Sequence, residues 1–203
     1  MELRAAPSVP GSRPRIEGDR EQEVLAAALE VLAEVGYDKF SLDRVAARAR
    51  AGKATLYRRW PTKADLVADA MAGLDTAPAA PPDTGTLRGD LLAMVAEREE
   101  GVLHATRTPV VCGLLTAMHR DPELSAALRG KVVDPRQECL RAVLEQARAR
   151  GEIDAAVDLE LITSIIPAMV VYQVGVEGRT DVSDLVTRLI DEVVLPAVQR
   201  RTG

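Results

Sequence analysis

The spacing of apolar residues predicts a chain made of helices. From Val24 to Val35, and again from Leu66 to Leu74, apolar side chains recur at every third or fourth position, which is the period of a helix with one buried face. The alternation of apolar and polar residues that marks a half-buried strand does not occur in the sequence, and neither does an internal repeat. We therefore expect an all-α fold of about nine helices.

Capping residues, glycine and proline set the expected ends of the first helices. Asp19 is expected to cap the first helix and Gly36 to end it. Ser41 and Thr62 are expected to cap the second and fourth helices, and Pro61 stops the third. These signals predict helices over about residues 19–36, 42–49, 53–60 and 62–74.

Residues 75–86 form a proline-rich stretch that is typical of a boundary between two lobes. Beyond it, the sequence predicts a break at Pro135, where Asp134 would cap a helix with proline in its first turn. The helices of this second half are predicted over about residues 87–104, 109–119, 122–149, 158–177 and 182–199.

The last two predicted helices, about 158–177 and 182–199, are too apolar for ordinary surface helices. Residues 161–176 are apolar on almost every side, so a helix here has to be covered all round. Two such helices can pair with their symmetry mates as a four-helix bundle, which predicts a homodimer through this pair. The alternative is that both are core helices of a monomer.

Composition agrees with a globular helical protein. Apolar residues make up 47% of the 203 positions and aromatic residues 2%, which favours closely packed helices over a β-sandwich. No apolar run reaches the length of about 18 residues that a membrane span needs, and residues 1–18 contain no apolar signal core. Cys112 and Cys139 are too far apart for a CxxC site, so we expect reduced thiols in a cytoplasmic protein.

The charge is distributed unevenly along the chain. The net charge is −5, which by itself argues against a nucleic-acid partner. Residues 41–63, however, contain seven basic residues and one acidic residue, a net charge of +6. A focused positive patch on an acidic body is typical of a surface that binds phosphate groups.

The helix predicted at residues 53–60 has one apolar side, with Leu56 and Trp60. Its opposite side presents cationic, hydrogen-bonding and small residues: Lys53, Ala54, Tyr57 and Arg58. A short helix of this kind fits the major groove of duplex DNA, where its first turn reads base edges. Thr55 can meet a phosphate oxygen, and Ser41 and Lys63 can hold the backbone on either side.

Residues 41–66 (SLDRVAARARAGKATLYRRWPTKADL) resemble the TetR family of one-component bacterial regulators. The most specific marks are Thr55-Leu56-Tyr57, Trp60 and Pro61-Thr62-Lys63. The resemblance is strong over about residues 20–74 and only architectural beyond them. It implies a dimer on double-stranded operator DNA and a small-molecule pocket in the second lobe that controls DNA affinity.

The resemblance also implies roles for individual residues. Tyr57, Thr55, Ser41 and Lys63 would contact phosphate or sugar, and Lys53 and Ala54, with Asp43 or Arg44, would touch bases. Two positions depart from the family pattern. Arg50 stands where the turn normally has glycine. A left-handed conformation costs a non-glycine residue on the order of 1 kcal/mol, so the turn is expected to be either strained or shaped differently. Gly52 stands where a serine cap is common, and this replacement costs only a few tenths of a kcal/mol.

These features divide the chain into five expected parts. They are a flexible tail (1–18), a three-helix helix-turn-helix DNA-binding domain (19–61), a connecting helix (62–74), a linker (75–86) and a helical ligand-binding and dimerisation domain (87–203).

Other chemistry finds little support in the sequence. A metal site needs three or four converging ligands, and Glu100 with His104 supplies at most two. Residues 52–55 lack the serine or threonine and the first glycine of a phosphate-binding loop. No catalytic Ser/His/Asp or Cys/His arrangement is evident, so we expect no enzyme, no metal and no cofactor.

Polarisable or half-polar side chains of the second lobe are candidates for contacting an effector. They are Met94, His104, Met118, Met169, Tyr172 and Gln173. Core packing explains the methionines equally well. We therefore expect a repressor that an unknown small molecule releases from its operator. The alternatives are a DNA-associated protein of this fold that acts by occupancy or protein contacts, and a helical binding protein or enzyme with a vestigial helix-turn-helix.

Overall fold

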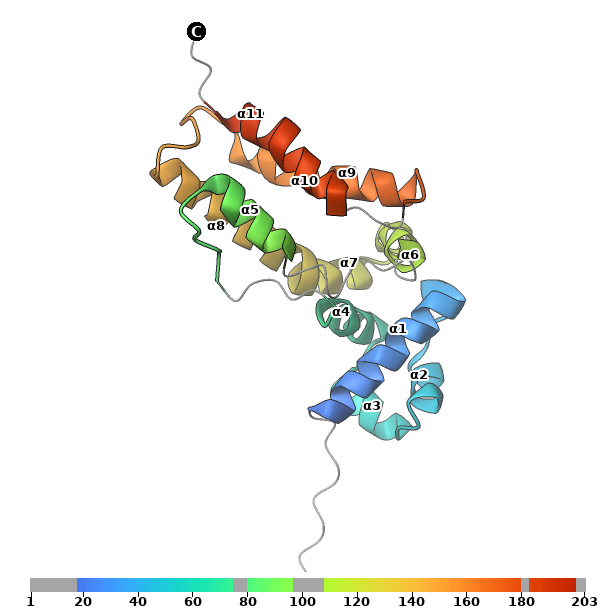
Figure 1. The fold of residues 1–203 in the computed structure, drawn as a ribbon. Coiled ribbons are helices and arrows are strands. Elements are labelled where there is room, and N and C mark those ends of the chain that lie inside the picture. Colours follow the sequence, from blue (N-terminus) through green and yellow to red (C-terminus); the bar gives the residue numbers. More distant parts are fainter. Residues whose placement is uncertain (1–17, 75–79, 97–107, 180–182, 200–203) are drawn as a thin grey trace, which may run out of the picture.

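The computed structural model describes residues 18–74, 80–96, 108–179 and 183–199. These residues form helices and connecting turns and contain no strand. Figure 1 shows α1, α2 and α3 at one end of the molecule and α9, α10 and α11 at the other, with α4, α6 and α7 between them. The expected all-α fold with an N-terminal helix-turn-helix is confirmed.

The helices of the first half are α1 (Asp19–Lys39), α2 (Leu42–Arg48), α3 (Lys53–Arg59), α4 (Lys63–Ala72), α5 (Leu87–Ala96) and α6 (Thr108–Met118). Those of the second half are α7 (Pro122–Leu128), η1 (Arg129–Val133), α8 (Asp134–Ala149), α9 (Leu159–Gly175), α10 (Ser183–Leu189), η2 (Ile190–Val194) and α11 (Leu195–Val198), where η marks a π-helical turn. Since α7, η1 and α8 are continuous, as are α10, η2 and α11, the described residues form nine continuous helices.

Several predicted helix ends have the expected local chemistry. The Ser41 hydroxyl accepts a hydrogen bond from the Arg44 amide at 3.4 Å, and the Thr62 hydroxyl accepts one from the Asp65 amide at 3.1 Å. Gly36 has a φ of 70° and a non-helical ψ, so the regular part of α1 stops there and one further turn follows.

Three predicted signals at helix ends are wrong. Asp19 does not cap α1, because the cap is Gly18, whose carbonyl accepts from the first amides of the helix. Asp134 caps nothing, because its own amide already donates to the Arg129 carbonyl inside a continuous helix. The chain also does not break at Pro135. The π-helical turn η1 lies directly before this residue, and it lets the helix continue although proline has no amide hydrogen to donate.

The hydrophobic core consists of two clusters. The first cluster joins α1–α4 with α6 and α7, and Leu56, Trp60 and Val67 are fully buried in it. The second cluster joins α5, α8, α9, α10, η2 and α11 around Leu144 and Ile190. Because α4 packs against both α1 and α7, the N-terminal helices share one core with part of the second half.

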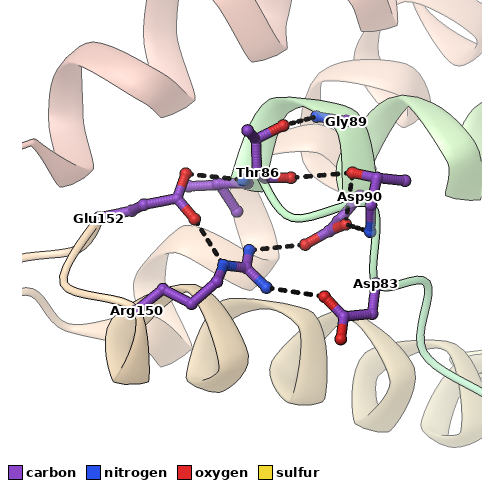
Figure 2. A network of polar contacts seen from close by, with 8 residues as sticks. Asp83, Thr86, Gly89, Asp90, Arg150 and Glu152 are labelled. Atoms are coloured by element: carbon purple, nitrogen blue, oxygen red, sulfur yellow. Dashed lines mark hydrogen bonds and ion pairs between the residues drawn. The ribbon is translucent and has the colours of Figure 1, made fainter.

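A polar network, here called the α5 clasp, fastens the start of α5 to the end of α8 (Figure 2). Arg150 donates to Asp90 at 2.7 Å, to Glu152 at 2.7 Å and to Asp83 at 3.3 Å. Glu152 also accepts from the first amide of α5, that of Leu87, at 2.8 Å. The clasp thereby satisfies a free amide at the helix end.

Gly89 allows the chain to close around the clasp. A Cβ atom at this position would collide with the hydroxyl groups of Thr84 and Thr86. The Gly89 amide instead donates to the Thr86 hydroxyl at 3.1 Å. A larger residue here would therefore push the threonines away from the clasp.

No helix in the part of the chain that the structure describes is both long and apolar enough to cross a lipid bilayer.

Candidate DNA-binding surface

The nine residues predicted to contact DNA gather on α2, α3 and the first turn of α4. None of them is buried. Exposed side chains are Asp43, Arg44, Lys53, Ala54, Tyr57 and Arg58, and partly exposed ones are Ser41, Thr55 and Lys63. The buried side of the same helices, with Leu42, Val45 and Leu56, belongs to the core cluster that also contains residues of α1 and α4. The structure thus brings all nine residues to the surface of one small lobe.

Of the two alternatives left open for the turn between α2 and α3, the structure has the left-handed one. Arg50 has a φ of 50°, a conformation that costs a non-glycine residue on the order of 1 kcal/mol. The Arg20 guanidinium of α1 donates to the Ala49 carbonyl at 2.7 Å and to the Arg50 carbonyl at 3.0 Å. Arg20 therefore supports the turn from outside, a role that the sequence pattern did not reveal.

The carboxylate of Asp43 engages two predicted DNA contacts. Lys53 Nζ donates to Asp43 Oδ2 at 2.6 Å, and the Tyr57 hydroxyl donates to Asp43 Oδ1 at 3.4 Å. The hydrogen bond between Lys53 and Asp43, together with the negative charge of Asp43, raises the pKa of Lys53. In the free protein, the side chain expected to read a base is therefore held by an acidic residue of the neighbouring helix.

Two further cations of the basic segment are paired with α1. Arg48 donates to Glu30 at 3.0 Å and to Glu34 at 2.6 Å, and these hydrogen bonds raise its pKa. Arg59 donates to Glu21 at 2.6 Å. The +6 charge of residues 41–63 is therefore partly compensated in three dimensions. Sequence alone did not reveal this, because it depends on how α1 crosses α2 and α3.

Lys63 lies at the junction of α1, α4 and α7. Its Nζ donates to the Tyr37 carbonyl at 3.2 Å and lies 4.0 Å from the centroid of the Tyr37 ring. The Tyr37 hydroxyl donates at 2.7 Å to Asp121, the residue that caps α7. An ammonium group has three donors, so Lys63 retains donors for a phosphate while one is engaged.

Asp69 on α4 is a second junction. Its carboxylate accepts from Trp60 Nε1 at 2.8 Å, on the side of α3, and from Lys131 Nζ at 2.5 Å, on the side of η1. One side chain thus connects the end of the predicted recognition helix to the turn between α7 and α8.

The residues predicted to contact an effector do not gather at one place. Met118 packs against the first core cluster and Met94 against the second. Met169 and Tyr172 lie on the outer face of α9, with 37% and 47% of their surface exposed. Gln173 is half-buried, and its side-chain oxygen is buried without a hydrogen-bond partner.

His104 and Glu100, the pair considered as metal ligands, lie outside the described residues, as does most of the N-terminal tail. Among the residues that the structure does describe, no group of three His, Cys, Asp or Glu side chains is arranged to hold a metal ion.

Comparison with protein families matches both halves of the chain. Residues 24–70 match the family of bacterial regulatory proteins of the tetR family, and residues 81–193 match the tetracyclin repressor-like C-terminal domain. The chain belongs to the TetR family. It is a DNA-binding transcriptional regulator, and regulators of this family bind operator DNA, typically as dimers.

Relatives support the TetR assignment over nearly the whole chain. An uncharacterized HTH-type transcriptional regulator of Mycobacterium tuberculosis is 40% identical over 91% of this chain and 90% of its own length. The DNA-binding transcriptional repressor TetR of Mycobacteroides abscessus is 39% identical over 89% of this chain and 94% of its own. Among solved structures, the TetR family transcription regulator SCO0332 has 27% identity and a TM-score of 0.64, covering 88% of this chain and 97% of its own.

Proposed function

We propose that this TetR family regulator is a repressor whose hold on its operator is relieved by a small molecule bound in the second lobe. The observation that carries the proposal is the position of α4, which shares a core with α2 and α3 and also packs on α7. The named relative from Mycobacteroides abscessus is a repressor. A solved structure of this fold at 18% identity, FadR from Bacillus subtilis, contains stearoyl-CoA.

The proposed coupling runs through two polar contacts between the DNA-binding lobe and α7–η1. They are the hydrogen bond from Tyr37 to Asp121 and the contact of Lys131 with Asp69. A ligand that binds better when α7 takes a different position would shift α7, and α4 would move with it. This movement would change the distance between the two copies of the recognition helix α3 in the dimer. Its effect on operator affinity equals its differential affinity for the two arrangements.

The dimer is proposed to form through α9 and the helix α10–η2–α11. Their outer face exposes large apolar side chains, with 64% of Leu161, 70% of Val176 and 41% of Val193 exposed in the single chain. A monomer does not normally leave so many large apolar side chains of one helix pair in water. Two copies related by a twofold axis would cover it and present two reading helices about 34–36 Å apart, the spacing of successive major grooves.

A gel-shift titration tests the proposed control by a ligand. A duplex selected from a random-sequence library is bound by the protein and then titrated with a library of small metabolites. We expect at least one compound to weaken duplex binding about tenfold or more while the dimer persists, and the duplex to weaken binding of that compound by the same factor. If no compound does so, the protein acts by occupancy alone.

Lys63→Ala is expected to weaken binding to all duplexes similarly. Since Lys63 would meet a phosphate, the variant should also have a shallower plot of log K, the logarithm of the binding constant, against the logarithm of the salt concentration. Its slope should be smaller in magnitude by about one unit. The matched control is Arg88→Ala, which removes a cation on α5 that is paired with Asp191, at 2.7 Å, far from the reading helices. An unchanged slope for Lys63→Ala would exclude a phosphate contact.

A further inference from the structure

Asp43 is an unusual residue for a surface that meets DNA. It is the only acidic residue in residues 41–63, and 48% of its side chain is exposed. A carboxylate here is repelled by DNA phosphates, which weakens binding to any duplex unless it meets a hydrogen-bond donor. A role in DNA recognition therefore requires a donor on the DNA that suits it.

The geometry of the free protein sets an acceptor and a donor side by side. Asp43 projects from the first turn of α2 and Lys53 from the first turn of α3. Their Oδ2 and Nζ atoms are 2.6 Å apart, and the Tyr57 hydroxyl occupies the other carboxylate oxygen at 3.4 Å. The pair is exposed, and an exposed ion pair contributes about 0–1 kcal/mol of stability. Separating Asp43 from Lys53 on binding therefore costs little free energy.

Base edges in the major groove provide the matching chemistry. A carboxylate there accepts from the N4 amino group of cytosine, and a lysine donates to O6 and N7 of guanine. The C·G base pair carries these two partners, the cytosine amino group and the guanine O6 and N7 acceptors, on a single edge. The adjacent acceptor and donor of Asp43 and Lys53 therefore match the edge of that pair.

We propose that Asp43 and Lys53 act together to read one C·G base pair in each operator half-site. Asp43 accepts from the cytosine amino group, and Lys53 donates to the guanine of the same pair. This inference rests on the DNA-binding role of α2 and α3 in the proposed function. Where thymine replaces that cytosine, Asp43 faces a carbonyl acceptor in place of an amino donor, so it also acts by lowering affinity for such duplexes.

Selection from a random-sequence duplex library with the full chain tests the inference. The wild-type protein is expected to enrich sites with an invariant C·G pair at one position of each half-site. Changing that pair to T·A replaces the amino donor by a carbonyl acceptor and should lower wild-type affinity about 5- to 150-fold. This comparison needs no variant, so it does not depend on whether a mutant folds.

Asp43→Ala should prefer the C·G duplex over the T·A duplex clearly less than the wild type does, with only the Lys53 contact to guanine left to discriminate, and should bind unselected duplex more tightly than the wild type does. The matched control is Asp38→Ala, which removes another exposed carboxylate of the same lobe, one paired with Arg120 at 3.3 Å. It should keep the full preference for C·G. Both substitutions are at exposed sites, so thermal unfolding should stay close to that of the wild type.

The outcomes separate this inference from the function on which it rests. If the selected sites lack an invariant C·G pair, or if Asp43→Ala keeps the wild-type preference, the reading role is overturned while DNA binding stands. If the wild-type protein enriches no duplex at all, the proposed function fails, and this inference fails with it.

Discussion

Asp90→Ala is expected to lower the free energy of unfolding by about 3 kcal/mol. The Asp90 side chain is fully buried at the centre of the α5 clasp (Figure 2). It accepts from the Thr84 amide at 2.6 Å, from the Thr84 hydroxyl at 2.7 Å and from Arg150 at 2.7 Å. Its removal leaves the Thr84 amide and hydroxyl without their acceptor and takes the one buried carboxylate away from Arg150, which keeps only Glu152 and Asp83. A polar group left unpaired in the interior costs more than its hydrogen bond contributed.

Asp83→Ala is the matched control, because Asp83 contacts the same arginine from the protein surface. Its side chain is 70% exposed and lies 3.3 Å from Arg150. An exposed ion pair of this kind contributes little to stability, so we expect the free energy of unfolding of Asp83→Ala to stay within about 0.5 kcal/mol of the wild-type value. Urea unfolding of the two variants measures the difference. Equal losses would show that burial of Asp90 is not what makes the clasp stabilising.

The pH dependence of the same variant gives a second readout. Burial by itself would raise the pKa of Asp90, but the hydrogen bonds from Thr84 and Arg150 outweigh it and lower the pKa. A lowered pKa means that the charged clasp stabilises the fold above the unfolded pKa of about 3.9, and that this stabilisation is lost as the pH falls through the folded value. The difference in free energy of unfolding between the wild type and Asp90→Ala should therefore become smaller below about pH 4.

Met169→Glu is expected to convert the proposed dimer into monomers. Met169 lies midway along the exposed apolar stretch of α9, and 37% of its surface is exposed in the single chain. In a twofold interface each copy would bury a carboxylate without a partner, a cost of several kcal/mol per charge. Among the described residues of α10, η2 and α11, Arg188 is the only cation, and Glu192 already pairs with it at 3.1 Å.

Loss of the dimer should lower operator affinity roughly 100-fold or more, because the second reading helix is no longer held near its half-site. Sedimentation and gel-shift measurements on the same sample report both effects. Ala149→Glu is the control, since it adds the same charge at an exposed position on α8 and should remain dimeric. A Met169→Glu protein that stays dimeric would show that the subunits meet elsewhere.

Several features of the DNA-binding lobe were predictable from the sequence because they depend on neighbours along the chain. Ser41 and Thr62 cap the helices that follow them, and Arg50 adopts the left-handed conformation that was one of the two alternatives for its turn. Leu56 and Trp60 are fully buried, as their spacing predicts. Each of these outcomes follows from backbone geometry and helical period, which act over a few residues.

The failures of prediction also have local causes. Gly18 took the capping position expected of Asp19, because the helix begins one residue earlier than predicted and the Gly18 carbonyl accepts from the amides of Glu21 and Gln22. At Pro135 the prediction assumed that a missing amide ends a helix. A π-helical turn gives the chain another way to accommodate that residue, and sequence periodicity does not distinguish the two.

By itself, the sequence determined the helical class, the helix-turn-helix and the identity of the residues on its outer face, because periodicity and capping are written in short stretches of chain. Only the tertiary structure decided which charges oppose one another. Glu30 and Glu34 meet Arg48 across two helices, Asp43 meets Lys53, and Arg150 meets a buried Asp90 from 60 residues away. Such pairs depend on helix crossing and burial, which arise when distant segments pack together, so no pattern along the chain encodes them directly.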